Sequence, residues 1–180
     1  MRKALPIILF LSIAAACLSG CSDAETRRAL RRMMGSTIVL PEKVTCVQNG
    51  EVFPMPEELR SRPKLIVFVD STECSLCKID KIIHYRELFE LADESESFEL
   101  MILLSPIRSE LSFILDHLRY SPKSYPIYVD ERGLFRSINK WIPNSASLHS
   151  MTVNCGNQVV LVGDPVYNNS IMELFLKTIL

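Results

Sequence analysis

Short apolar runs rich in β-branched and aromatic residues recur along this chain and predict strands. They lie at 65–69, 98–104, 125–129, 150–153 and 158–162. Between them, apolar residues recur every three or four positions among charged residues, which predicts helices. These helices cover 78–92, 111–119, a short part of 131–141 and the segment from Ile171. Strands that alternate with helices predict an open α/β sheet with helices on both faces.

Two hairpins flank this alternation. Near the beginning, 36–40 and 44–47 are β-prone, and an Asn-Gly turn at 49–50 leads into 51–53. Near the end, a turn at 154–157 joins the last two strands. The second hairpin adds an antiparallel edge, so the predicted sheet is mixed.

The first residues have the pattern of an export signal. Two basic residues at 2–3 precede an apolar stretch at 4–16 that is too short to span a bilayer comfortably. The sequence Leu-Ser-Gly-Cys at 18–21 resembles the lipobox of bacterial lipoproteins. That resemblance implies removal of 1–20 as a signal peptide and lipid attachment at Cys21, which anchors the protein to a membrane. The alternative is an ordinary secretory signal that ends near a chance cysteine.

The residues after Cys21 refine the expected location. Ser22 is not the aspartate that is associated with inner-membrane retention in some bacteria, which favours the outer membrane, facing the periplasm. The segment 21–35 is rich in arginine, and we expect a solvated tether, the alternatives being a short helix or contact with anionic head groups. The domain then covers 36–180. Without the two basic residues of the signal, 18 basic residues face 21 acidic ones, a net charge of −3, which gives no sign of a nucleic-acid partner.

Export also decides how the cysteines are interpreted. Of six, four remain after the lipid site, in a compartment that permits disulfides: Cys46, Cys74, Cys77 and Cys155. A four-cysteine zinc site usually needs a second close pair, and Cys46 and Cys155 do not provide one. Those two stay open to three interpretations: unpaired buried thiols, a structural disulfide, or a second redox relay.

Cys74-Ser75-Leu76-Cys77 is placed where the strand 65–69 turns into the helix 78–92. Free backbone N–H groups and the helix dipole favour a thiolate at a helix N-terminus. The two-residue spacing lets one thiolate attack a substrate disulfide while the other resolves the mixed disulfide. The motif therefore predicts dithiol chemistry.

Val-Phe-Val-Asp at 67–70, the Cys-x-x-Cys motif and the order of elements resemble the thioredoxin superfamily, and more narrowly the exported TlpA-type thioredoxins. The segment 125–130 looks like the strand that leads to the active-site proline in those proteins. The segments 34–41 and 159–165 look like those of small thioredoxin-like lipoproteins from Bacteroidetes. The resemblance covers about 35–180 and implies a three-layer α/β/α fold with a central mixed sheet and an N-terminal β-hairpin.

In such a fold Cys74 is the more exposed, attacking sulfur, and Cys77 is partly buried and resolves. Glu73 disfavours the Cys74 thiolate, whereas Lys78 favours it; thioredoxins usually carry an aromatic residue at the position of Glu73. The resemblance implies thiol–disulfide exchange with exported proteins, no organic cofactor, and a membrane redox partner that recharges the pair. The direction of exchange, reducing or oxidising, is left open.

One departure concerns the second loop of the site. Thioredoxins place a cis-proline where the chain enters the strand that corresponds to 151–154. Here Leu148 and His149 occupy that place, and Pro143 comes several residues too early. The departure puts the docking of peptide substrates in question.

It also opens a metal alternative. Cys74, Cys77 and His149 would form a soft site suited to Cu(I), or to zinc with a fourth ligand. That arrangement is similar to the copper-handling Sco proteins, whose cysteine spacing is one residue longer. A third alternative is a non-catalytic binding module in which Cys74 and Cys77 form a merely structural bridge.

Overall fold

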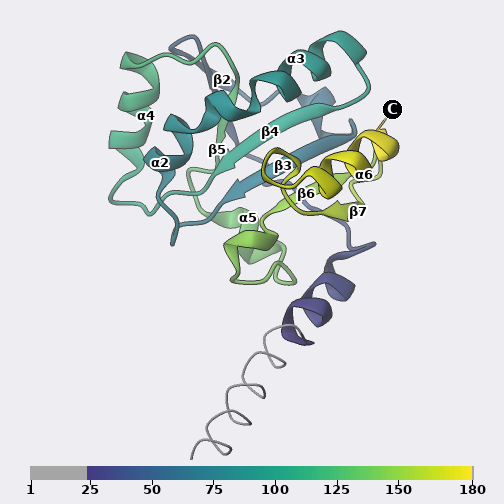
Figure 1. Cartoon of the computed structure of the whole chain (residues 1–180). Helices are drawn as coiled ribbons and strands as arrows, with labels where there is room; N and C mark the ends of the chain where they lie inside the picture. Colours follow the sequence, from purple (N-terminus) through teal and green to yellow (C-terminus); the bar gives the residue numbers. More distant parts are fainter. Residues whose placement is uncertain (1–23, 180) are drawn as a thin grey trace, which may run out of the picture.

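The computed structural model describes residues 24–179 and contains a seven-stranded sheet (Figure 1). The strand order is β2-β1-β5-β4-β3-β6-β7. The strands are β1 (Thr45–Gln48), β2 (Glu51–Pro54), β3 (Lys64–Val69), β4 (Glu99–Leu104), β5 (Ile127–Val129), β6 (Ser150–Val153) and β7 (Val159–Val162). The predicted signal peptide and its lipid site at Cys21 lie outside the described residues.

Both predicted hairpins are present, and they make the sheet mixed. The central strands β3, β4 and β5 are parallel, whereas β1 pairs antiparallel with β5 and β6 pairs antiparallel with β3. All six residues of β3 are buried, as expected for a strand covered on both faces. The turn between β1 and β2 has positive φ at Asn49 and Gly50, and a Cβ at Gly50 would lie 2.9 Å from the Arg119 carbonyl oxygen.

The helices cover both faces of the sheet. After the first helix, the α-helices are α2 (Ser75–Asp80), α3 (Arg86–Ser95), α4 (Leu111–Tyr120), α5 (Leu134–Ile138) and α6 (Asn169–Ile179). The 3-10 turns are η1 (Glu57–Arg60), η2 (Ile82–Tyr85), η3 (Ala146–Leu148) and η4 (Pro165–Tyr167). The helix predicted over 78–92 is thus three pieces. Ile79, Ile82, Tyr85 and Leu88 are all buried, and a 3-10 turn keeps residues with this three-residue spacing on one face.

Alternate residues of β3 point into two separate cores. Leu65, Val67 and Val69 pack with α2, α3, α4 and α6, whereas Ile66 and Phe68 pack with α5 and the N-terminal segments. Figure 1 shows α2, α3 and α6 along one side of β3 and β4, with α5 and the first helix on the other. The predicted three-layer arrangement is confirmed.

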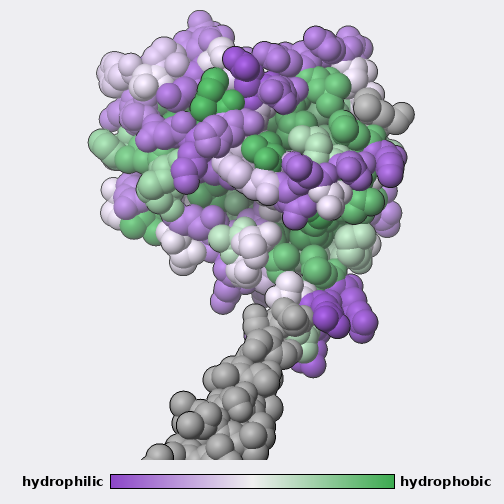
Figure 2. Space-filling view, viewed as in Figure 1, coloured by the Kyte–Doolittle hydropathy of each residue, from purple (hydrophilic) through white to green (hydrophobic). Residues whose placement is uncertain are grey.

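The expected solvated tether is instead a packed helix at 24–33. Ala29 and Met33 are buried in the core, and Leu30 packs against it, because these positions share one helix face. Four arginines occupy the exposed positions: Arg27, Arg28, Arg31 and Arg32. Figure 2 shows hydrophilic side chains gathered at this end of the molecule. The solvated tether is therefore wrong for these residues, while the domain boundary at 36 stays a prediction.

The first β-prone run, 36–40, forms only one isolated bridge, between Thr37 and Gln158. Ile38 and Leu40 are nevertheless buried, so this run contributes to the core without becoming a strand. Within residues 24–179, no helix has both the length and the apolar character needed to cross a membrane.

Candidate dithiol site

Cys74 and Cys77 form a disulfide where the chain leaves β3 and enters α2. Their Cα atoms lie 5.3 Å apart, and the N–H of Cys77 donates to the Sγ of Cys74 over 3.2 Å. Cys74 is the N-cap residue of α2, so its sulfur meets the free N–H groups of the first turn. Both cysteines are exposed, because Ser75 and Ile79 form the buried side of this helix. The partial burial predicted for Cys77 is wrong.

Hydrogen bonds hold the turn that precedes the disulfide. The N–H of Asp70 donates to Oε1 of Glu73 over 3.0 Å, and the N–H of Glu73 donates to the Asp70 carbonyl over 2.9 Å. The Asp70 carboxylate accepts from Thr72 and forms an ion pair with Arg136 of α5. The turn is thereby fixed on both sides before Cys74 begins the helix.

Glu73 and His149 link this turn to the loop before β6. His149 is 2% exposed, and its Nδ1 lies 2.7 Å from Oε1 of Glu73. Its Nε2 lies 2.8 Å from the Pro143 carbonyl, which can only accept, so Nε2 carries a proton. One further proton must lie between Nδ1 and Oε1, and the pair is then neutral as a unit. Burial raises the pKa of Glu73, but hydrogen bonds from His149 and Asp70 outweigh it and hold that pKa below its ordinary value.

Lys78, directly after Cys77 in α2, belongs to a second polar cluster. Its Nζ donates to the hydroxyl of Tyr85 over 2.7 Å and lies 3.8 Å from the Asp164 carboxylate. Tyr85 donates in turn to Asp164, which also accepts from Ser150 over 3.3 Å. Burial lowers the pKa of Lys78, while the carboxylates of Asp164 and Glu73 act in the opposite direction. Burial and the Asp164 carboxylate raise the pKa of Tyr85.

Three hollows meet around the disulfide, and Glu73 lines all of them. One of about 340 Å³ is lined by both cysteines and Lys78, and one of about 360 Å³ by Cys74 and the exposed Phe113. The third, of about 480 Å³, includes His149 in its lining. A substrate thiolate can therefore approach the disulfide from solvent.

The metal alternative is not assembled. Both ring nitrogens of His149 have other partners, Glu73 and the Pro143 carbonyl. In the described part of the chain, no three His, Cys, Asp or Glu side chains are grouped so that they could hold a metal ion. In this structure Cys74, Cys77 and His149 are thus not brought together as a ligand set.

The loop before β6 departs from a thioredoxin as predicted. His149 directly precedes β6, and its carbonyl accepts from the N–H of Phe68 over 3.0 Å. Residues 24–179 contain no cis peptide bond. A buried, hydrogen-bonded histidine therefore occupies the place where the resemblance to thioredoxins leads one to expect a proline.

Cys46 and Cys155 do not pair. Cys46 lies in β1 and Cys155 in the turn between β6 and β7, with three strands between β1 and β6 at about 4.8 Å each. Burial raises the pKa of Cys46 from its ordinary value of 9.0 to about 11, although a hydrogen bond with Tyr128 acts against this. Cys46 is the unpaired buried thiol that was one of the expectations, whereas Cys155 is exposed.

Tyr85 and Asp164 carry no local sequence signal of a functional site. In the sequence, Tyr85 fits the apolar pattern of an amphipathic helix, and Asp164 is typical of a turn before Pro165. They meet Lys78 only because η2 turns Tyr85 inward and β7 ends beside it. Only the fold brings these residues together.

No family model matches the chain, and no curated protein matches it. Among solved structures, the chain is similar to the C-terminal domain of a protein described as a thiol–disulfide oxidoreductase of Bacteroides thetaiotaomicron. The two share 11% identity and a TM-score of 0.50, and the match covers 82% of this chain and 97% of that chain. A structure described as the thiol:disulfide interchange protein DsbE of Chlorobium tepidum has 10% identity, with 80% and 98% covered and a TM-score of 0.52.

The exposed lipoprotein thioredoxin Etrx1 of Streptococcus pneumoniae is similar at 14% identity, with 74% of this chain and 97% of that chain covered and a TM-score of 0.50. At these identities the likeness shows the fold alone. The chain has the thioredoxin-like fold that the sequence predicted.

Proposed function

We propose that this protein catalyses thiol–disulfide exchange with the cysteines of exported proteins, with Cys74 as the attacking sulfur and Cys77 as the resolving one. The observation that carries this is the exposed Cys74–Cys77 disulfide at the start of α2, in a thioredoxin-like fold. A bridge that served only to hold the fold together would gain nothing from being open to substrate thiols.

In the reducing direction, the Cys74 thiolate attacks one sulfur of a substrate disulfide and expels the other as a thiolate. The Cys77 thiolate then attacks Sγ of Cys74, which releases the second substrate sulfur and closes the Cys74–Cys77 bond. The substrate gains two electrons and two protons, and a redox partner in the membrane must reduce the protein again. The oxidising direction is the same sequence reversed.

The place of this reaction is a bacterial membrane, on its extracytoplasmic side. The Leu-Ser-Gly-Cys sequence at 18–21 supports lipid attachment at Cys21, and Ser22 supports the outer membrane, facing the periplasm. Labelling of cells with a traceable palmitate should mark the wild-type protein. A Cys21→Ser variant should carry no label, and a labelled variant would contradict anchoring at this residue.

A glutathione redox titration tests the exchange itself. The Cys74–Cys77 state is read by alkylation and mass spectrometry, with Cys155→Ser as a matched control that removes an exposed thiol outside the site. Reversible exchange at a potential of roughly −120 to −270 mV is expected, and the value within that range indicates the direction. A pair that stays oxidised far below that range would overturn the proposal in favour of a structural bridge.

A further inference from the structure

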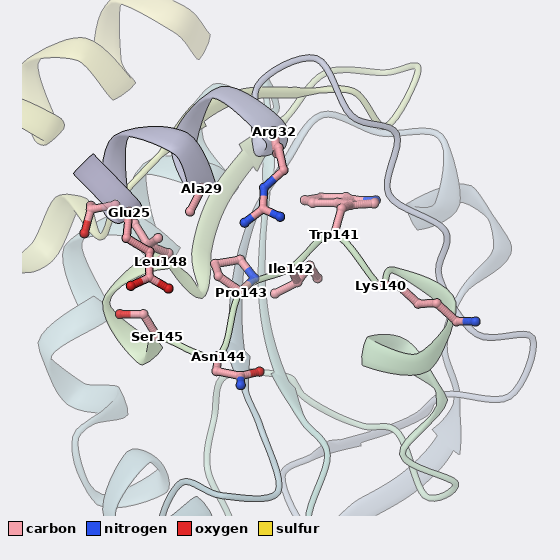
Figure 3. A pocket seen from close by; sticks show the side chains of 11 residues that line it. Glu25, Ala29, Arg32, Lys140, Trp141, Ile142, Pro143, Asn144, Ser145 and Leu148 are labelled. Atoms are coloured by element: carbon pink, nitrogen blue, oxygen red, sulfur yellow. The ribbon is translucent and has the colours of Figure 1, made fainter. Parts of the chain in front are cut away.

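A pocket away from the disulfide lies between the helix 24–33 and the segment 140–148 (Figure 3). Its volume is about 490 Å³, within the range of small-molecule sites. Neither cysteine of the dithiol lines it. It has both polar and apolar walls, which is typical of a site that orients a ligand.

Arg32 supplies the positive charge that extends into this pocket. Figure 3 shows its side chain extending from the helix into the pocket, between Trp141 and Pro143, whereas Lys140 points away. Within residues 24–179 Arg32 has no ion-pair partner. Glu25, two helical turns earlier, also lines the pocket but forms no ion pair with it. A guanidinium is therefore free to bind a carboxylate through two parallel hydrogen bonds.

The apolar wall of the pocket indicates the chemistry of the part of the ligand that Arg32 does not bind. Trp141 is half-buried, and Ile142 and Leu148 are buried beside it. We propose that this pocket binds a carboxylate attached to an apolar group, the chemistry of both a small organic acid and a peptide C-terminus. Arg32 holds the carboxylate, and the indole of Trp141 covers the apolar group.

The floor of the pocket is tied to the dithiol turn by two separate contacts. The Pro143 carbonyl accepts from His149, which pairs with Glu73. Asn144 accepts from Arg136, which pairs with Asp70. Since Asp70 and Glu73 frame the turn before Cys74, a ligand that shifts the floor should change the reactivity of that thiol. This link, unlike the binding, rests on the proposed function.

The chain contains one tryptophan, and it lines the pocket, so intrinsic fluorescence reports occupancy directly. The full chain in a neutral detergent is titrated with N-acetylphenylalanine. We expect a saturable change in Trp141 fluorescence, and affinity about tenfold weaker in Arg32→Gln, because a charge-assisted pair is lost. Arg31→Gln is the matched control: it removes the same charge from an exposed neighbour outside the pocket and should leave the affinity within about twofold. No saturable change, or equal losses in both variants, would overturn the proposal.

Two further probes define the ligand. The uncharged amide of N-acetylphenylalanine should bind at least about tenfold more weakly, because it offers Arg32 no carboxylate, and equal binding of the amide would overturn the role of Arg32. Phenylpropionate carries the same ring and carboxylate without a peptide group. Equal affinity for it identifies a small organic acid as sufficient, whereas much tighter binding of N-acetylphenylalanine identifies a peptide C-terminus.

The link to the dithiol is measured separately, as the alkylation rate of reduced Cys74 with the pocket empty and saturated. A change of about twofold or more is expected. An equal rate would overturn the link. The fluorescence titration uses no thiol chemistry, so its failure leaves the proposed exchange standing, and failure of the exchange leaves the binding site standing.

Discussion

Lys64, the first residue of β3, and Lys78, in the helix that follows the same strand, are both mostly buried but have different surroundings. Lys64 is 0% exposed, and its Nζ donates to a neutral oxygen, Oδ1 of Asn157, over 2.8 Å. Burial lowers its pKa from 10.5 to about 8, and Glu99 offsets only part of this. Lys78 instead contacts Tyr85 and lies beside the carboxylate of Asp164.

Burial of a lysine has different consequences at the two ends of β3. Where Lys64 is buried, no carboxylate of residues 24–179 lies within ion-pair distance of the cation, so its burial costs stability. Beside the disulfide, Lys78, Tyr85 and Asp164 satisfy one another, and Lys78 borders an open hollow. We therefore expect changes at the first end to alter stability alone, and changes at the second to alter reactivity.

Loss of a cysteine of the dithiol should have the strongest effect on exchange. Cys74→Ser should reduce exchange turnover by at least about 10³-fold, since a hydroxyl does not attack disulfides at neutral pH. Stability of the reduced protein should hardly change, because serine is a favoured N-cap residue. Turnover is measured with a small aromatic disulfide, and Cys155→Ser should keep the full rate. Even about a tenth of the wild-type rate in Cys74→Ser would refute its role as the attacking sulfur.

Lys64→Met should stabilise the protein without changing exchange. The pKa of Lys64 is lowered on folding, so the unfolded chain binds more protons between about pH 8 and 10.5, and wild-type stability rises with pH there. Below pH 8 the full penalty is present, roughly 3 kcal/mol before loss of the Asn157 hydrogen bond is subtracted. Urea unfolding of wild type and variant should show a gap at pH 7 that narrows by about 1 kcal/mol at pH 9.

The difference in stability between wild type and Lys64→Met is not affected by the titration of Cys46. Burial raises the pKa of Cys46 to about 11, so its thiol lowers stability as pH rises from 9.0 to 11. This contribution is the same in wild type and Lys64→Met and cancels in the difference. A gap that does not change with pH would contradict the interpretation of Lys64 as a buried, penalised cation.

Lys78→Met is the same substitution at the other end of the comparison, and its effect should have the opposite sign. It leaves Tyr85 and Asp164 without their cation, which should lower the free energy of unfolding by about 2 kcal/mol. Alkylation of Cys74 should also become slower, because a nearby positive charge is lost. Urea unfolding and iodoacetamide kinetics measure the two effects. If both lysine variants were more stable than wild type, the proposed difference between Lys64 and Lys78 would be wrong.

His149→Gln should have the smallest effect. It turns the neutral Glu73–His149 pair into a lone carboxylate beside Cys74, which should slow alkylation at neutral pH roughly threefold to tenfold. The double variant Glu73→Gln/His149→Gln removes that charge and should recover most of the rate. If the double variant is as slow as the single one, the effect comes from the altered loop and not from charge.

Local pattern was sufficient for most of the scaffold. The runs at 65–69 and 150–153 became β3 and β6, and the Asn-Gly turn made the first hairpin, because burial of alternate residues and turn chemistry act over a few positions. The Cys-x-x-Cys motif likewise fixed the place of the disulfide at a strand-to-helix turn. These features depend on neighbours in sequence.

The rest depends on contacts between distant parts of the chain. Glu73 and His149 are 76 positions apart, and Tyr85 and Asp164 are 79 apart, so no local period indicates either pair. The helix at 24–33 was expected to be solvated because its arginines dominate its composition. One face of this helix is buried because Ala29, Leu30 and Met33 pack against the core. That core is built from distant segments, so the packing cannot be inferred from the local sequence.

The packing of the helix at 24–33 against the core also affects how far from a membrane a lipid-anchored dithiol could move. The described part of this helix begins at residue 24, three positions after the proposed lipid site at Cys21, and three positions along a chain span roughly 10 Å at most. A longer linker would let an anchored domain reach partners farther from the membrane. A lipid at Cys21 would therefore confine the dithiol to a thin layer at the membrane surface, and substrates would have to reach it there.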